Sequence, residues 1–152
     1  MLKPLFLAAT LASAAVFTGC ASMQAPSQQM TENLQQLQNR AWIATQIGNT
    51  EIKAPPAAHS LPSIQFDEAS KRVSGSDGCN RIMGAYAAGH DTLQLSQLAS
   101  TRMACMNSAG IDQQYNEALA KVTHYQVFGR TLKLLDRHGN LLIQFESAVQ
   151  PR

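Results

Sequence analysis

The stretch from Ser74 to Tyr86, SGSDGCNRIMGAY, joins two predicted strands through a turn that carries a cysteine. Ser76-Asp77-Gly78 contains the residue types that favour turns. The following segment, from Arg81 to Ala87, favours a strand, with Gly84 as a candidate bulge or close-approach site. The chemistry of Cys79 in this turn depends on the compartment of the protein, which the N-terminus indicates.

The N-terminus, MLKPLFLAATLASAAVFTGC, has the organisation of an export signal. Lys3 precedes an uncharged apolar run over residues 5–17, which is shorter than the about 20 residues of a membrane-spanning helix. The run ends in small residues before Cys20, as in secretory signals. It resembles a bacterial lipoprotein signal, in which Cys20 is acylated, palmitate included, and becomes the first mature residue. Phe17 departs from the usual Leu, Val or Ile, and an ordinary signal peptide with an incidental cysteine is the alternative.

The residue after Cys20 also predicts the destination of the protein. Ala21 stands there rather than aspartate, which by resemblance to enterobacterial sorting favours the outer membrane. We therefore expect a signal peptide over 1–19, a lipid anchor with a polar, Gln-rich tether over 20–39, and one folded domain over 40–152. The domain is expected to face the periplasm, with the membrane as a partner through the N-terminal lipid.

The composition excludes one class of partner and names no other. The formal net charge is +2 and 14% of residues are charged. No basic stripe interleaved with aromatic residues occurs in the sequence, so nothing predicts nucleic-acid binding.

Apart from Cys20, the chain has two cysteines, Cys79 and Cys105. An even pair in an oxidising compartment predicts a disulfide. The alternatives have less support, because a redox-active pair is usually spaced C-x-x-C and a nucleophilic thiol needs a recognisable base. The four histidines show no paired spacing that would favour zinc. We expect no metal and no cofactor.

The remaining pattern predicts a mainly β (α+β) domain. Short alternating segments separated by turn residues indicate seven or eight strands, and one segment has helical periodicity with Ser108 or Asn107 as its cap. Such strands suggest a small antiparallel β-barrel, closed or partly closed, with one α-helix packed on it. The expected strands cover residues 41–47, 63–67, 71–75, 81–87, 92–96, 124–128, 131–135 and 141–146, and the helix covers 109–121.

Two short motifs in this framework resemble the META domain. The first is Gly78-Cys79-Asn80-Arg81, followed by Gly84 and Tyr86, and the second is Thr101-Arg102-Met103-Ala104-Cys105. The resemblance covers Trp42 to Phe145, and its best-known bacterial members are HslJ-type, heat-shock-associated lipoproteins. It implies a β-rich barrel with one helix, a disulfide between the motif cysteines, and a role in stress response or inhibitor tolerance. It implies no catalytic reaction.

One position departs from the family pattern. A proline often follows the second motif cysteine, whereas this chain has Met106-Asn107. The departure concerns the local turn.

The polar motif residues have two interpretations each. Asn80 is a candidate ligand-binding amide, but asparagine more often closes a turn onto nearby backbone. Arg81 and Arg102 adjoin the motif cysteines, and two guanidinium groups there could hold a carboxylate or phosphate. The alternative for both is packing over the barrel rim with pairing to Asp77 or to carbonyl groups.

The function expected from these observations is that of a non-enzymatic binding or interaction module. No Ser-His-Asp arrangement and no pair of catalytic carboxylates is recognisable. The alternative is a carrier of a small apolar molecule or lipid inside the barrel, lined by Trp42, Tyr86, Tyr115 and Phe128 if these are not simply core. We expect a monomer whose partner is an envelope protein or a small apolar ligand. The possible binding surface comprises Gly78, Asn80, Arg81, Gly84, Tyr86, Thr101 and Arg102.

Overall fold

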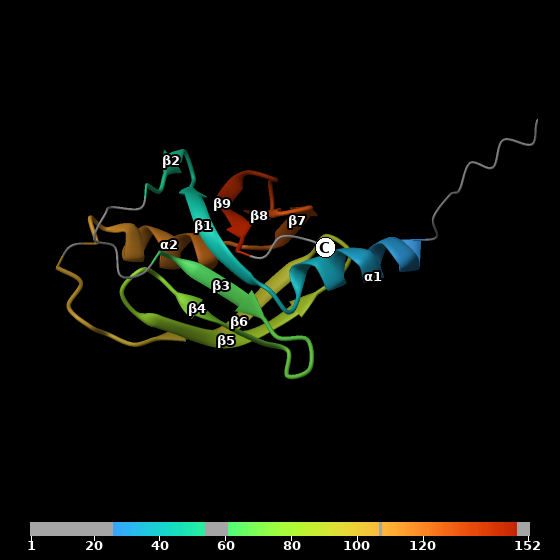
Figure 1. The fold of residues 1–152 in the computed structure, drawn as a ribbon, viewed down its shortest axis with the longest axis horizontal. Helices are drawn as coiled ribbons and strands as arrows, with labels where there is room; N and C mark the ends of the chain where they lie inside the picture. The colour runs from blue at the N-terminus through green and yellow to red at the C-terminus, as the bar shows by residue number, and fades with distance from the viewer. Residues whose placement is uncertain (1–25, 54–60, 107, 149–152) are drawn as a thin grey trace, which may run out of the picture.

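The structure is a computed structural model that describes residues 26–53, 61–106 and 108–148. Within these ranges the chain forms nine strands and two helices (Figure 1). The helices are α1 (Pro26–Leu37) and α2 (Ile111–Leu119). The strands are β1 (Ala41–Ile47), β2 (Thr50–Glu51), β3 (Ser63–Phe66), β4 (Arg72–Ser76), β5 (Arg81–Ala88), β6 (Leu93–Ser100), β7 (His124–Phe128), β8 (Thr131–Leu135) and β9 (Leu141–Ser147).

All strand pairs are antiparallel, in the order β6-β5-β4-β3-β1-β9-β8-β7, with the short β2 paired to β1. The sheet curls until its two end strands approach each other. Thr92, just before β6, forms a bridge with His124 of β7, and the Leu93 N–H donates to the Thr123 carbonyl at 2.9 Å. The contact ends there, which leaves a half-barrel. The predicted mainly β fold with a partly closed barrel is therefore confirmed.

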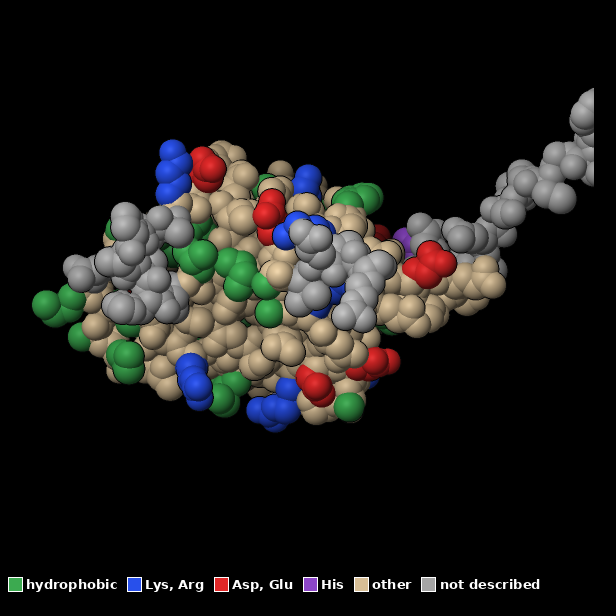
Figure 2. All heavy atoms as spheres, viewed as in Figure 1, with side chains coloured by type: hydrophobic (Ala, Val, Ile, Leu, Met, Phe, Trp, Pro, Cys, Tyr) green, Lys and Arg blue, Asp and Glu red, His purple; other side chains and the backbone are tan. Residues whose placement is uncertain are grey.

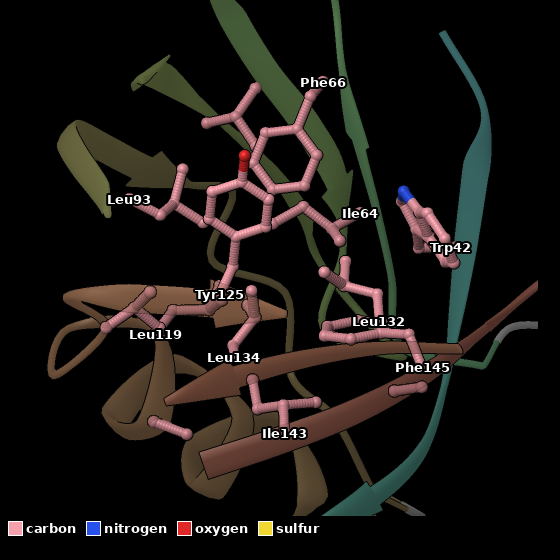
Figure 3. Close-up of a cluster of buried hydrophobic side chains, with 14 of the residues drawn as sticks. Trp42, Ile64, Phe66, Leu93, Leu119, Tyr125, Leu132, Leu134, Ile143 and Phe145 are labelled. Carbon is pink, nitrogen blue, oxygen red and sulfur yellow. The ribbon is translucent and has the colours of Figure 1, made fainter. Parts of the chain in front are cut away.

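The core lies inside the curl of the sheet (Figure 3). Side chains on a strand alternate between its two faces, so in β5 the inward positions are Ile82, Gly84 and Tyr86, while Arg81 and Met83 point outward. The largest side chains of the interior are aromatic. Phe66 meets Tyr86 edge to face with ring centroids 5.1 Å apart. The largest buried side chains are those of Trp42, Tyr115, Tyr125, Phe66 and Phe145.

Helix α2 confirms the predicted helix, but its start differs from the prediction. Tyr115, Ala118 and Leu119 are buried against the sheet. The residue at the N-cap is Gly110, in the left-handed conformation with φ 77°, and no side chain caps the helix. Ser108 instead accepts a hydrogen bond from the Gly110 N–H through its Oγ, so the prediction that it caps the helix is wrong. The other predicted cap, Asn107, lies outside the described residues.

Helix α1 occupies part of the segment that was expected to be a polar tether. Its last residue, Leu37, is fully buried, and Gln38 after it is buried with 5% exposure. The Gln38 amide donates to the Tyr86 hydroxyl at 2.7 Å, and the Trp42 indole donates to the Leu37 carbonyl at 2.9 Å. The chain is thus part of the fold before residue 40. The expected signal peptide and residues 20–25 lie outside the described residues.

The pairing of β5 with β6 contains the bulge expected at Gly84. The register shifts between Met83 and Ala85, and Gln97 on the opposite strand has φ 51°. A Cβ atom on Gly84 would lie 2.8 Å from the Ser96 carbonyl oxygen, closer than the strands allow. Glycine is therefore required by the close approach of two backbones.

Replacing Gly84 with alanine should lower the free energy of unfolding by about 1–3 kcal/mol, because the added methyl group forces β5 and β6 apart. Urea denaturation followed by the fluorescence of Trp42 measures this. The control is Ala87→Ser, an exposed position on the same strand, expected to stay within about 0.5 kcal/mol. Equal stability of the two variants would contradict the steric argument.

Candidate functional site

The site lies where two loops meet, which we call the motif loops: residues 77–80 between β4 and β5, and residues 101–106 after β6. Cys79 of the first loop and Cys105 of the second form a disulfide, with their Cα atoms 5.9 Å apart. The structure thus brings together the two cysteines that the sequence predicted to pair. A link across 26 positions contributes about 3–4 kcal/mol through the restriction of the unfolded chain.

The first motif loop is organised around the carboxylate of Asp77, which is only 1% exposed. Its Oδ1 accepts hydrogen bonds from the backbone N–H of Cys79 at 2.9 Å and of Asn80 at 2.6 Å. Its Oδ2 accepts one from the Asn116 amide of α2 at 2.8 Å. A buried carboxylate needs such donors, and these three fix the turn against the helix. The sequence identified the turn but gave no sign of the link to Asn116.

Asn80 joins the two motif loops. Its Oδ1 accepts a hydrogen bond from the backbone N–H of Met103 at 2.7 Å, and its Nδ2 donates to the Sγ of Cys105 at 3.4 Å. The side chain is buried, which agrees with a structural role. The expectation that it closes a turn onto nearby backbone is wrong, since its partners lie in the other loop.

The remaining motif residues divide between backbone support and the core. Thr101 extends the strand pairing, because its N–H donates to the Arg81 carbonyl at 3.0 Å and its Oγ1 accepts the Arg81 N–H at 3.1 Å. Gly78 has φ 97°, which favours glycine. Gly84 and Tyr86 face the interior, so their side-chain positions do not belong to an outer binding surface.

Arg81 and Arg102 are exposed, and neither guanidinium group has a hydrogen-bond or ion-pair partner within the described ranges. The alternative of pairing with Asp77 does not occur, because that carboxylate is buried and bound to other donors. The second loop adds two exposed thioethers, with Met103 at 64% and Met106 at 89% exposure. We call Arg81, Arg102, Met103 and Met106 the loop surface. Figure 2 shows hydrophobic side chains projecting at this end of the molecule.

The aromatic residues considered as lining a ligand cavity are mostly part of the packed core. Trp42, Tyr86 and Tyr115 are buried, and the Tyr115 hydroxyl donates to the Ser63 carbonyl at 3.0 Å. Burial raises the pKa of Tyr115 far above its usual value and that of Tyr125 to about 12. Phe128, in contrast, is 67% exposed and lines no interior space. The hydroxyl groups of Tyr115 and Tyr125 both donate to backbone carbonyls of the fold.

Two further features bear on what the site can do. Among the described residues, no group of three or more His, Cys, Asp or Glu side chains could hold a metal ion. A surface hollow of about 540 Å³ lies beside the seam between β6 and β7, with Ala87, Gly89, Leu93 and Val122 in its lining. It carries no ionisable side chain.

The comparison with protein families agrees with the motifs and the fold. The profile of the META domain matches residues 35–149. The chain belongs to the META domain family. None of the curated proteins is detectably similar to it in sequence. No helix in the described part of this META domain protein is long and apolar enough to cross a membrane.

Solved structures share the fold of the domain. A Burkholderia xenovorans protein determined by NMR has a TM-score of 0.58 at 23% identity, covering 97% of this chain and 100% of its own. A second NMR structure gives 0.58 at 24% identity, with 83% and 97% coverage. A crystal structure of a DUF4847 family protein from Bacteroides vulgatus gives 0.50 at 22% identity, with 72% and 93% coverage. At these identities the likeness concerns the fold alone.

Asp77→Ala should lower the free energy of unfolding by about 2–4 kcal/mol, because it removes the acceptor of two backbone N–H groups and one of the two acceptors of the Asn116 amide. Asp77→Asn keeps one acceptor oxygen and should cost less. Chemical denaturation with the disulfide intact measures both. Asp91→Ala, at an exposed carboxylate, is the control and should be nearly neutral. A neutral Asp77→Ala would show that the turn does not depend on its carboxylate.

Proposed function

We propose that this chain is a non-enzymatic, lipid-anchored protein of the cell envelope, and that its META domain is a binding module that supports stress response or tolerance of inhibitors. The observation that carries this proposal is the loop surface. It combines two guanidinium groups that have no partner within the described ranges with two exposed methionine side chains. Both motif loops are held by internal contacts.

The rigidity of the motif loops supports binding over a purely structural role. The disulfide, the Asn80 bond to the Met103 N–H and the Asp77 bonds all fix the backbone from which the exposed side chains project. A surface fixed in advance loses less conformational entropy on binding. Arginine and methionine are enriched at protein interfaces, and a guanidinium group can bind a carboxylate or phosphate through two hydrogen bonds. The partner best suited to this surface is therefore an envelope protein with an apolar, acidic face.

The position of the loop surface is compatible with attachment at Cys20. Helix α1 and the end of the molecule that carries the motif loops lie at opposite ends of the long axis (Figure 1). A chain anchored through its N-terminus, as the HslJ-type resemblance implies, would carry α1 nearer the membrane. In outer-membrane attachment the loop surface would then point into the periplasm.

The interior of the half-barrel gives the carrier alternative less support. Aromatic and aliphatic side chains from both arms of the sheet meet there (Figure 3). A small apolar molecule or lipid would have to displace residues such as Trp42 and Phe145, which are fully buried. An enzyme is also less well supported, because Thr101, the hydroxyl next to Arg102 in sequence, is engaged in strand pairing.

The lipid anchor predicts that Cys20→Ser abolishes labelling by an alkyne analogue of palmitate. The variant should also move the protein out of the membrane fraction, since a polar side chain supplies no apolar anchor. The matched control replaces both Cys79 and Cys105 with serine and should keep the label. Labelling that survives in Cys20→Ser would refute the anchor.

The binding role predicts that Arg81→Ala combined with Arg102→Ala abolishes tolerance when it replaces the natural chain. Hydrogen bonds to charged groups contribute about 1.5–3 kcal/mol each, so partner binding should weaken at least about tenfold. Survival after heat or exposure to envelope-active inhibitors is the readout, with the melting temperature measured in parallel.

The control for this experiment is Arg72→Ala, which removes an exposed arginine of β4 outside the motif loops. It should leave tolerance unchanged. If the double variant protects as well as the natural chain, the loop surface is not the binding site. If a strain without the protein shows no sensitivity, the role in stress tolerance is wrong.

A further inference from the structure

Strand β6 lies at one end of the sheet order and has an open side. It pairs with β5 through most of its length. On its other side, strand pairing within the described residues is limited to the bridge at Thr92, where the Leu93 N–H donates to the Thr123 carbonyl and the Tyr125 N–H donates to the Asp91 carbonyl. From Gln94 to Ser100 no strand in the described part of the chain covers this side. Such an edge presents backbone N–H and C=O groups that can pair with another strand.

The composition of β6 leaves this edge poorly protected. Proteins usually guard an edge with charged residues or proline, and LQLSQLAS contains neither. The bulge at Gln97 is the one such device in the strand. Apolar side chains are exposed beside the edge, with Leu98 at 36% and Met83 of β5 at 48%. A neutral edge of this kind favours a partner strand over solvent.

The charges that flank β6 indicate what that partner is. Asp91 lies two positions before the strand, Arg102 lies two positions after it, and both are exposed. When two copies of the same edge align antiparallel, the Asp91 end of one copy lies beside the Arg102 end of the other, at both ends of the pair. A parallel alignment would instead set like charges together. Opposite charges across paired strands are favourable, and a two-fold arrangement repeats the contact.

We propose that two copies of this protein associate through antiparallel pairing of their β6 edges over residues 94–100. The pairing continues the sheet of one copy into the sheet of the other. This dimer replaces the monomer that we expected from the sequence. The sequence does not show which strand lies at the edge of the sheet. The dimer needs neither the lipid anchor nor a stress-related partner.

The first test places a photo-crosslinking residue on the edge of the full-length chain in its own cells. With p-benzoylphenylalanine at Ser96, illumination should give a product of twice the chain mass, in which peptides of two copies are joined. The matched control places the same residue at Ser74, which is exposed on the inner strand β4, and should give no such product. No product at Ser96, or a product with a different protein, would overturn the proposal.

The second test exchanges the flanking charges and uses the yield of this product as readout. Asp91→Lys and Arg102→Glu, each alone, set like charges together and should lower the yield roughly two- to tenfold. The two changes in one chain restore opposite charges and should recover the yield. A double variant that stays as low as the single ones would rule out the antiparallel alignment. Because Arg102 also belongs to the loop surface, stress tolerance is not a readout here, and the two proposals can fail separately.

Discussion

The arrangement of the motif loops depends on the hydrogen bonds that the buried carboxylate of Asp77 accepts. It accepts hydrogen bonds from the backbone N–H groups of Cys79 and Asn80, two residues of the first motif, and from the side-chain amide of Asn116 on α2. The turn therefore has one orientation relative to the helix, and that orientation aims Cys79 at Cys105. Asn80 is directed to the second loop in the same way. The turn and helix α2 are far apart in sequence, and they are held together because the Asp77 side chain accepts hydrogen bonds from both.

The motif residues have different structural roles in this arrangement of the loops. Asn80 and Thr101 hold the backbone, Gly84 permits the approach of two strands, and Tyr86 belongs to the core. These positions are constrained by the fold and carry little information on a ligand. The side chains that remain available to a partner are those of the loop surface, including Met103 and Met106. In this chain the motif residues therefore specify the architecture of the loops rather than a ligand.

The sequence predicted the features that depend on local patterns. Alternation located most strands, and helical spacing located α2. The features that were missed depend on contacts distant in sequence. Helix α1 is polar and Gln-rich, and the burial of Leu37 and Gln38 arises only when β1 and β5 are in place. No periodic pattern in the sequence reveals the hydrogen bond from Asn116 to Asp77 or the bond from the Met103 N–H to Asn80. The open side of β6 likewise depends on the order of the strands in the sheet.

The pairing of β1 with β9 has a consequence for biosynthesis. β1 is the first long strand of the chain and β9 the last, yet they are neighbours in the sheet. A chain synthesised from its N-terminus presents β1 long before its neighbour β9 exists. Until then Trp42 and Phe145, which belong to the same core cluster, cannot come together. The core is therefore complete only once β9 has been synthesised, and until then one side of β1 is left without its partner strand.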